Sequence, residues 1–407
     1  MPLSKAPRGG RMQSQDTTHH DDMPSPSKAK AITSSQIVTA DSVEAEEVPT
    51  IPLGSLQTLS SLQPEISIHS VASTRSVSMP APLVVQPSEY RRSLGEWLSV
   101  WWEGMRPGYL SLSITPVVVG SVLAWTQSIA GKSLLGHFHV LRFLATLIAV
   151  ILLQIGAHLV NDYYDYLKGI DTSNSLGPGG LIQQGLIKPS RVLSFGLVLL
   201  TLGALAGVLV AISGGLLVFV FGLVGLLAAY FYSATSRPLS SIALGELVSF
   251  LIFGPCITLG AYIVQTGHMD RLVLLYSIPL GLLATAFIHL NNMRDIESDL
   301  QAGKHTLASL WGLRMNRAFY VLLLLGVYAP IVALGVPHHA PHLLLLTLWT
   351  LPTAIVAITG VLRTDAPASL HLAMHQTLRV EVYFTLWLVV ALFLSALLPL
   401  LPHFAFL

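Results

Sequence analysis

The chain has 407 residues, of which 52% are hydrophobic and only 11% are charged, and its mean hydropathy is +0.65. Soluble domains usually carry about 25% charged residues, so this composition excludes a soluble globular protein and indicates an integral membrane protein. The net charge of +1 favours no partner class, but no basic patch with interleaved aromatics occurs, so we expect no nucleic-acid partner.

Residues 1–90 differ in composition from the rest of the chain. Serine, threonine, proline and glutamine dominate them, and such a segment buries too little apolar surface to offset its ordering entropy. It also lacks the apolar core of a secretory signal, and its acidic residues argue against a transit peptide. We therefore predict a disordered extension over 1–90, either regulatory or dispensable, and a transmembrane domain over 91–407.

An amphipathic helix is predicted to begin near Glu89 and to lie in the membrane interface. Its apolar residues recur at helical spacing: Leu94, Trp97, Leu98, Trp101, Trp102 and Met105. Arg91 and Arg92 precede them, as is typical of a helix that lies on a membrane surface. Arg106-Pro107 then turns the chain into the bilayer.

Nine apolar runs follow, each close to the roughly 20 residues that a helix needs to cross a bilayer. They lie at about 109–127, 141–160, 193–212, 214–233, 243–265, 272–290, 318–336, 342–362 and 381–400. Only Ser213-Gly214-Gly215 separates the third from the fourth, which predicts a tight helical hairpin. We therefore predict an all-α integral membrane protein with about nine transmembrane helices in a bundle around a central cavity.

Lysine and arginine gather in the loops on one side of this predicted bundle. That side holds Arg91, Arg92, Arg106, Lys168, Lys188, Arg191, Arg237, Arg294, Lys304, Arg314, Arg317, Arg363 and Arg379, and the other holds Lys132, Arg142 and Arg271. Because positive loops stay on the cytoplasmic side, we expect a multi-pass protein of the cell membrane. Its N-terminus and polar loops face the cytoplasm, and its C-terminus lies opposite.

The first of two acidic clusters, residues 161–171, directly follows an apolar run on the cytoplasmic side. Asn161 and Asp165 are four residues apart and share a helix face, with Asp162 close to it. Lys168 adds a cation. Asp171 follows Gly169, where the helix is expected to end or bend.

The second cluster, residues 291–299, also follows an apolar run on that side. Asn291, Asp295 and Asp299 form an i, i+4, i+8 stripe on the predicted helix. Asn292 and Arg294 flank this stripe. Gly303 then ends the helix, and Lys304 places a further cation in the same loop.

The two clusters indicate a shared ligand, because carboxylates at the mouth of a membrane helix are costly to desolvate. Hard, closely spaced oxygen ligands are typical of Mg²⁺ that holds a phosphorylated group. The twelve-residue EF-hand pattern and a Cys/His ligand set are both absent from the clusters, which argues against a calcium EF-hand and against zinc. The alternative is that these residues are solvated caps at helix ends.

Three further polar residues lie near the clusters. Glu246 opens the fifth run, where it either favours the N-terminal helix dipole or faces the cavity. His158 and His289 each lie just before a cluster, either as hydrogen-bonded structural groups or as catalytic bases.

The pairing of Asn161-xxx-Asp165-xxxxx-Asp171 with Asn291-Asn292-Met293-Arg294-Asp295-xxx-Asp299 resembles the UbiA superfamily of intramembrane prenyltransferases. The segments 161–171 and 302–308 look most like the menaquinone branch, MenA, as do 245–255 and 264–267. The resemblance covers roughly residues 100–400. His158 departs from it, because many members have asparagine there, and the segment at Gly177-Pro178 lacks the arginine of some relatives.

This resemblance implies Mg²⁺-dependent transfer of a prenyl group from polyprenyl diphosphate to 1,4-dihydroxy-2-naphthoate, with decarboxylation to demethylmenaquinone in menaquinone biosynthesis. It implies catalytic roles for Asp165, Asp171, Asp295 and Asp299, which bind metal together with Asn161. It implies diphosphate binding by Asn161, Lys168, Asn291, Asn292, Arg294 and Lys304.

Two other kinds of function stay open from the residues alone. Another aromatic or quinone prenyltransferase of the same superfamily would share these motifs. A cation-coupled transporter also uses intramembrane acids, but it predicts them near the bilayer midplane with unwound helices and inverted repeats. Here the acids lie at helix ends, and a structural scaffold would need no acidic clusters.

Overall fold

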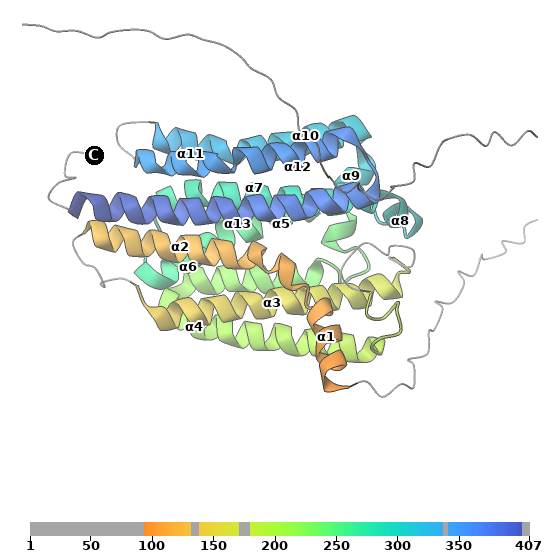
Figure 1. Ribbon diagram of the computed structural model, residues 1–407. Helices are drawn as coiled ribbons and strands as arrows, with labels where there is room; N and C mark the ends of the chain where they lie inside the picture. Colours follow the sequence, from red (N-terminus) through yellow and green to blue (C-terminus); the bar gives the residue numbers. More distant parts are fainter. Residues whose placement is uncertain (1–92, 132–137, 171–179, 337–340, 401–407) are drawn as a thin grey trace, which may run out of the picture. The chain divides into compact units, whose positions relative to one another are not determined.

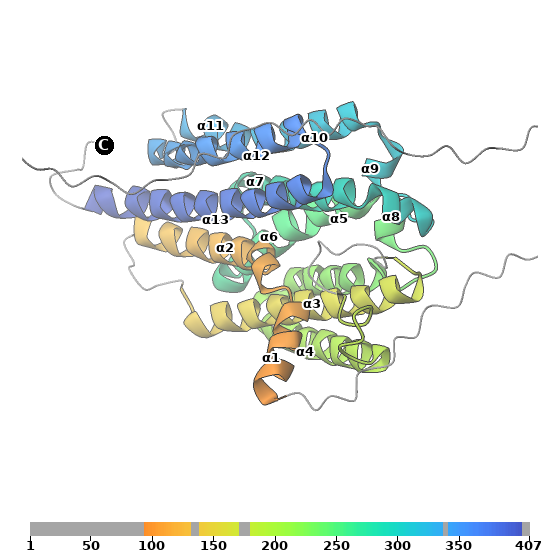
Figure 2. The ribbon, with the colours of Figure 1, turned by 45° about the vertical axis from the view of Figure 1, so that its right-hand side comes forward.

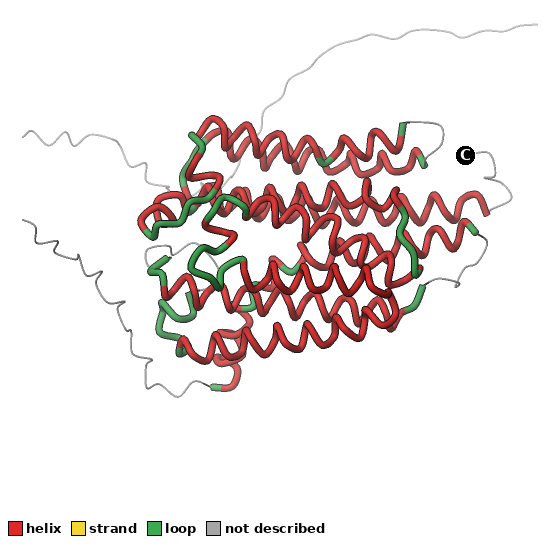
Figure 3. Tube along the Cα trace, turned by 180° about the vertical axis from the view of Figure 1, so that it is seen from behind, coloured by secondary structure: helices red, strands yellow, loops and turns green. Residues whose placement is uncertain are grey.

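The computed structural model describes residues 93–131, 138–170, 180–336 and 341–400. The predicted extension over 1–90, Asp171 and the segment at Gly177-Pro178 lie outside these residues, so the expectations for them stay predictions. Figure 3 shows only helices and loops in the described part of the chain, in agreement with the predicted all-α fold.

Helix α1 (Leu94–Gly104) is the predicted amphipathic helix. It begins at a capping box, in which Ser93 and Glu96 each accept a hydrogen bond from the other's backbone N–H. Its Trp101 is buried against Phe195 with the ring centroids 4.7 Å apart, whereas the other two tryptophans are exposed. The helix crosses the long helices at a steep angle (Figures 1 and 2), as expected for a helix in the membrane interface.

Eight helical elements in the described residues are long and apolar enough to cross a bilayer (Figure 1). They are α2 (Ser111–Ala130), α3 (Val140–Leu167), α4 (Pro189–Phe231), α5 with α6 (Gly245–Leu251 and Ile257–Thr266), α7 (Arg271–Arg294), α10 with α11 (Leu313–Gly326 and Tyr328–Gly335), a 3₁₀ segment with α12 (His342–Thr350 and Leu351–Arg363), and α13 (Pro367–Leu397). The short helices α8 (Ile296–Gln301) and α9 (Leu307–Leu310) lie at the end of the bundle where α3 ends.

Helix α4 is the predicted hairpin. Its backbone leaves the helical region at Gly215, where φ is 76°, a conformation that glycine adopts readily. Leu193 and Tyr230, from its two ends, pack in one apolar cluster with Val160 of α3, so the element doubles back on itself. Counting its two arms separately, the eight elements make nine passes, which agrees with the predicted number.

The last predicted span, 381–400, is too short. Helix α13 begins at Pro367. The polar residues between Pro367 and the apolar run continue the helix, because their side chains find hydrogen-bond partners on neighbouring helices. Thr377, for example, is 1% exposed, and its hydroxyl lies 2.9 Å from that of Tyr320 on α10. An apolar run therefore underestimates a membrane helix whose polar groups find partners inside the protein.

Close packing of α2 against α6 depends on Gly120. A Cβ atom there would lie 2.2 Å from the backbone oxygen of Thr258, which cannot move without shifting α6. We expect Gly120→Ala to lower the free energy of unfolding by about 1–3 kcal/mol, as overpacking does. Thermal unfolding in detergent measures this loss. Gly360→Ala on α12 is the control, because no atom lies within 4 Å of its added Cβ; equal midpoints for both variants would contradict the argument.

Candidate active site

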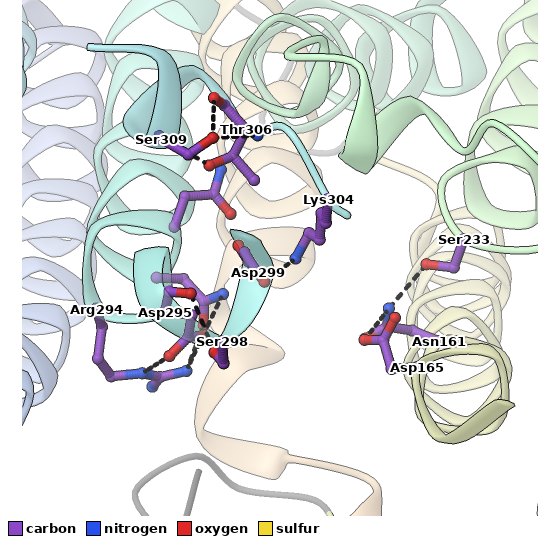
Figure 4. A network of polar contacts seen from close by, with 12 residues as sticks. Asn161, Asp165, Ser233, Arg294, Asp295, Ser298, Asp299, Lys304, Thr306 and Ser309 are labelled. Carbon is purple, nitrogen blue, oxygen red and sulfur yellow. Dashed lines mark hydrogen bonds and ion pairs between the residues drawn. The ribbon is translucent and has the colours of Figure 1, made fainter. Parts of the chain in front are cut away.

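The end of α3 forms one wall of the site. The side-chain nitrogen of Asn161 donates to Asp165 Oδ2 and to Ser233 Oγ, both at 2.8 Å (Figure 4). This contact confirms that Asn161 and Asp165 share a helix face. The helix ends at Leu167 with Lys168 as its C-cap residue, and Gly169 follows with a φ of 68°, which agrees with the predicted end of the helix at this glycine.

Asp162 points away from this wall and pairs with Arg106, at the turn between α1 and α2. The side chains are 3% and 16% exposed, so the ion pair is largely buried. Arg106 also has a φ of 53°, which is uncommon outside glycine and shows that the turn constrains its backbone. Arg106 was predicted as part of a turn and as a cation on the cytoplasmic side, but not as a site residue. The signal that could have indicated its role was its charge at the mouth of a membrane helix.

The second wall follows α7, and its backbone differs from the prediction. Helix α7 ends at Arg294, and Asp295 leaves the helical region before α8 begins. The stripe over 291–299 is therefore not on one uninterrupted helix. The N–H groups of Asp295 and Asp299 still donate to the carbonyls of Asn291 and Asp295, at 3.2 and 2.8 Å, which preserves the i, i+4 spacing.

Arg294 holds this wall together. Its Nε and Nη2 donate to the two carboxylate oxygens of Asp295 at 2.7 and 2.6 Å, and Nη2 also donates to Asn291 Oδ1 at 3.1 Å. Its Nη1 lies 3.2 Å from Nδ1 of His371 on α13. Arg294 thus orients two predicted site residues, in addition to supplying a cation.

Lys304 reaches the same wall from the loop after α8. Its Nζ lies 3.0 Å from Asp299 Oδ1, and the Asp299 side chain is 1% exposed (Figure 4). Burial raises the pKa of the Asp299 carboxyl to about 6, although Lys304 opposes the shift. Burial would lower the pKa of Lys304, but the carboxylates of Asp299 and Asp165 outweigh it and the pKa is raised.

A cavity of about 630 Å³ connects the two walls. Its polar end is lined by Asn161, Asp165, Asn291, Asn292, Arg294, Asp295, Lys304 and Arg106. Its remaining lining is mostly apolar and comes mainly from α3, α4, α5, α6 and the π-helical segment Ile252–Cys256 between the last two, including Val150, Leu153, Val210, Phe221, Phe253 and Ile257. The structure therefore brings seven of the described predicted residues to one cavity, with polar groups gathered at one end.

Two predicted residues in the described part lie behind this lining. Asp299 is covered by Lys304, and Lys168 donates to the backbone oxygen of Ser233 at 3.2 Å. Burial lowers the pKa of Lys168. Tyr232 was not among the predicted site residues, but it lines the cavity near Lys304, and burial raises the pKa of its hydroxyl.

The oxygen-rich polar end fits Mg²⁺ only together with a phosphorylated ligand. Within the described residues, no three His, Cys, Asp or Glu side chains converge to hold a metal ion by themselves. Mg²⁺ usually binds through one or two carboxylates and completes its shell with water and substrate phosphates. Asp299, whose Oδ2 has no hydrogen-bond partner among the described residues, and Asp165 opposite it are candidate ligands of this kind.

Behind the second wall, Glu246 lies in the first turn of α5, where a carboxylate favours the helix dipole, and it does not line the cavity. Its Oε1 accepts from Asn292 Nδ2 at 3.0 Å and lies 3.1 Å from His289 Nδ1. The other ring nitrogen of His289 lies 3.3 Å from the backbone oxygen of Asn316. This buried network positions Asn292 and gives His289 a structural role.

The described residues form a bundle of membrane-spanning helices around a cavity with an ionic mouth and an apolar remainder, which defines a multi-pass membrane protein with an internal binding site. The chain belongs to the UbiA prenyltransferase family, whose model matches residues 113–389. The predicted family, fold class and enzyme class are thereby confirmed.

Individual relatives agree with this family. A Bacillus subtilis protein named 1,4-dihydroxy-2-naphthoate octaprenyltransferase is 30% identical over 76% of this chain and 96% of its own length. UbiA prenyltransferase domain-containing protein 1 of Danio rerio is 34% identical over 70% of this chain and 82% of its own. A UbiA homologue of Archaeoglobus fulgidus, solved with DMAPP and Mg²⁺, matches 71% of this chain and 98% of its own with a TM-score of 0.50 and 14% identity, which bears on the fold alone.

Proposed function

We propose that this enzyme transfers a polyprenyl group from polyprenyl diphosphate to 1,4-dihydroxy-2-naphthoate, with loss of the carboxylate, to give demethylmenaquinol, the hydroquinone form of demethylmenaquinone. The observation that carries the proposal is one cavity with carboxylates and cations at its mouth and an apolar remainder. The charged mouth suits a diphosphate headgroup, and the apolar remainder suits a prenyl tail. The name of the Bacillus subtilis relative supports the naphthoate acceptor.

The polar end binds and orients the diphosphate. Asp165, Asp295 and Asp299, with Asn161 and with Asp171 outside the described residues, would hold Mg²⁺, which neutralises the diphosphate and makes it a better leaving group. Lys304 lines the cavity and adds a cation, while Arg294 keeps Asp295 and Asn291 in place. These groups stabilise the charge that develops as the C–O bond breaks.

The apolar part of the cavity holds the prenyl chain and excludes water. The departing diphosphate leaves an allylic cation, which the faces of nearby aromatic residues such as Phe287 and Tyr109 stabilise. The carbon of the electron-rich acceptor ring that carries the carboxylate attacks this cation and forms the new C–C bond. The ring carboxylate then leaves as CO₂, and its bonding electrons restore the aromatic ring.

We further propose that the protein resides in the cell membrane with the mouth of its cavity on the cytoplasmic side, as the positive-inside rule predicts. A water-soluble naphthoate acceptor would then reach the mouth from the cytoplasm, while the polyprenyl diphosphate stays in the bilayer with its headgroup at the interface.

The direct test uses purified protein in detergent with the naphthoate acceptor, radiolabelled geranylgeranyl diphosphate and Mg²⁺. We expect a prenylated, decarboxylated product that chromatography resolves and that chelation of Mg²⁺ abolishes. A parallel reaction with 4-hydroxybenzoate tests the alternative acceptor class. Prenylation of that acceptor alone would replace the naphthoate assignment, and no product with either would overturn the proposal.

The raised pKa of Asp299 predicts that Mg²⁺ binds more weakly in acid. Below a pH of about 6 this carboxyl is protonated and neutral, so a proton competes with the metal. We expect the half-saturating Mg²⁺ concentration to fall about tenfold per pH unit as pH rises toward 6 and to level off above it. Steady-state rates across that range measure this, and Asp299→Asn should flatten the profile. A wild-type profile that is already flat would contradict the prediction.

A further inference from the structure

Two polar side chains on α3 lie deeper in the cavity than the acidic wall. Gln154 and His158 are four residues apart, so they share a helix face, and both line the cavity. His158 is separated from Asn161 by three residues, about 4.5 Å along the helix axis toward the apolar part. The mechanism described so far uses neither of them.

Each of these side chains has one buried polar atom without a hydrogen-bond partner in the described part of the chain: Oε1 of Gln154 and Nε2 of His158. The amide of Gln154 has a fixed orientation, because its Nε2 donates to the backbone oxygen of Tyr109 at 2.9 Å. Its Oε1 can therefore only accept, and it requires a donor such as a hydroxyl group. A buried polar atom that lacks a protein partner is unfavourable, which favours a ligand that supplies one.

The surroundings of these two atoms suit a flat ring. The ring of Tyr109 lies edge-on to that of His158 with centroids 6.4 Å apart and to that of Phe287 at 4.7 Å. Phe287 and Tyr109 also line the cavity. One helical turn separates Gln154 from His158, about 6 Å along the axis, which is comparable to the distance between two para oxygens on a six-membered ring.

We infer that Gln154 and His158 bind the two ring oxygens of a para-dihydroxylated aromatic acceptor and so set which acceptors the enzyme accepts. Gln154 Oε1 accepts a hydrogen bond from one ring hydroxyl, and His158 Nε2 bonds the other. The ring then lies on the apolar side of Asn161, where a prenyl carbon next to the diphosphate would meet it. This assignment rests on the proposed prenyl transfer and adds to it the residues that select the acceptor.

The test begins with steady-state kinetics of His158→Leu and Gln154→Leu. We expect each to raise the KM for 1,4-dihydroxy-2-naphthoate at least tenfold, while the KM for prenyl diphosphate and the Mg²⁺ requirement change less than twofold. His158→Asn keeps a hydrogen-bonding group and should recover most of the loss. The matched control is Ile148→Ala on the same helix, which is exposed and does not line the cavity, and it should leave the acceptor KM within twofold.

Binding of the acceptor by itself separates this role from a structural one. Calorimetry under anaerobic conditions, without prenyl diphosphate, compares the dihydroxy acceptor with 1-hydroxy-2-naphthoate, which lacks the para hydroxyl. The wild type should prefer the dihydroxy compound at least tenfold, and the leucine variants should lose that preference. If the wild type is active and the leucine variants keep the preference for the dihydroxy compound, the inference is overturned. A wild type that prenylates no acceptor would instead overturn the proposed function.

Discussion

Replacing Asp165 or Asp295 by asparagine should lower the kcat of prenyl transfer by about 10²–10³-fold, the usual loss when one group that stabilises transition-state charge is removed. Asparagine keeps the size of the side chain but removes the negative charge that a divalent cation needs. Both aspartates line the polar end of the cavity, from opposite walls. The loss should therefore appear in the chemical step more than in binding of the apolar tail.

Single-turnover rates at saturating Mg²⁺ and prenyl diphosphate measure this effect, and thermal unfolding in detergent verifies that the variants fold. Glu297→Gln is the matched control. It removes one negative charge from the same segment as Asp295, but Glu297 is exposed and does not line the cavity. We expect its kcat to stay within about twofold of the wild type. Full activity in either aspartate variant would remove that residue from the site.

Local spacing was enough to predict the first wall and the hairpin. Asn161 and Asp165 are four residues apart on a helix, and this spacing alone places their side chains in contact, as the 2.8 Å hydrogen bond confirms. Two adjacent glycines between two apolar runs likewise predict the reversal at Gly215. In both cases the determining interactions lie within a few residues of one another, where a sequence pattern can detect them.

Contacts between distant segments escaped prediction. Arg106 meets Asp162 across 56 residues, and Glu246 meets Asn292 across 46. No periodicity relates such residues, because their approach depends on how whole helices pack. The interruption of the helix at Asp295 has a related cause: the bonds from Arg294 and the contact of Arg294 with His371 on α13 act at this point. The sequence therefore indicates the site residues better than it indicates what orients them.

The ion pair between Arg106 and Asp162 should contribute strongly to the stability of the fold. The Asp162 side chain is only 3% exposed, so Arg106→Met would leave a carboxylate buried without this partner. Breaking a buried pair on one side usually costs about 3–5 kcal/mol. We expect a loss of that size in the free energy of unfolding. Arg106 also fixes the turn that joins α1 to α2, which adds to its effect on stability.

The double variant Arg106→Met with Asp162→Asn separates the cost of burying the Asp162 carboxylate from the contribution of Arg106 to the backbone of the turn. It carries no buried charge at this position, so it should be more stable than Arg106→Met alone, although it lacks the attraction between the two groups. Arg314→Met is the control, since Arg314 is exposed on α10 and should change stability by less than about 0.5 kcal/mol. Unfolding midpoints in detergent rank the four proteins. If the double variant were no more stable than Arg106→Met, desolvation of Asp162 would not be the cause, and the role of Arg106 would lie in the backbone of the turn.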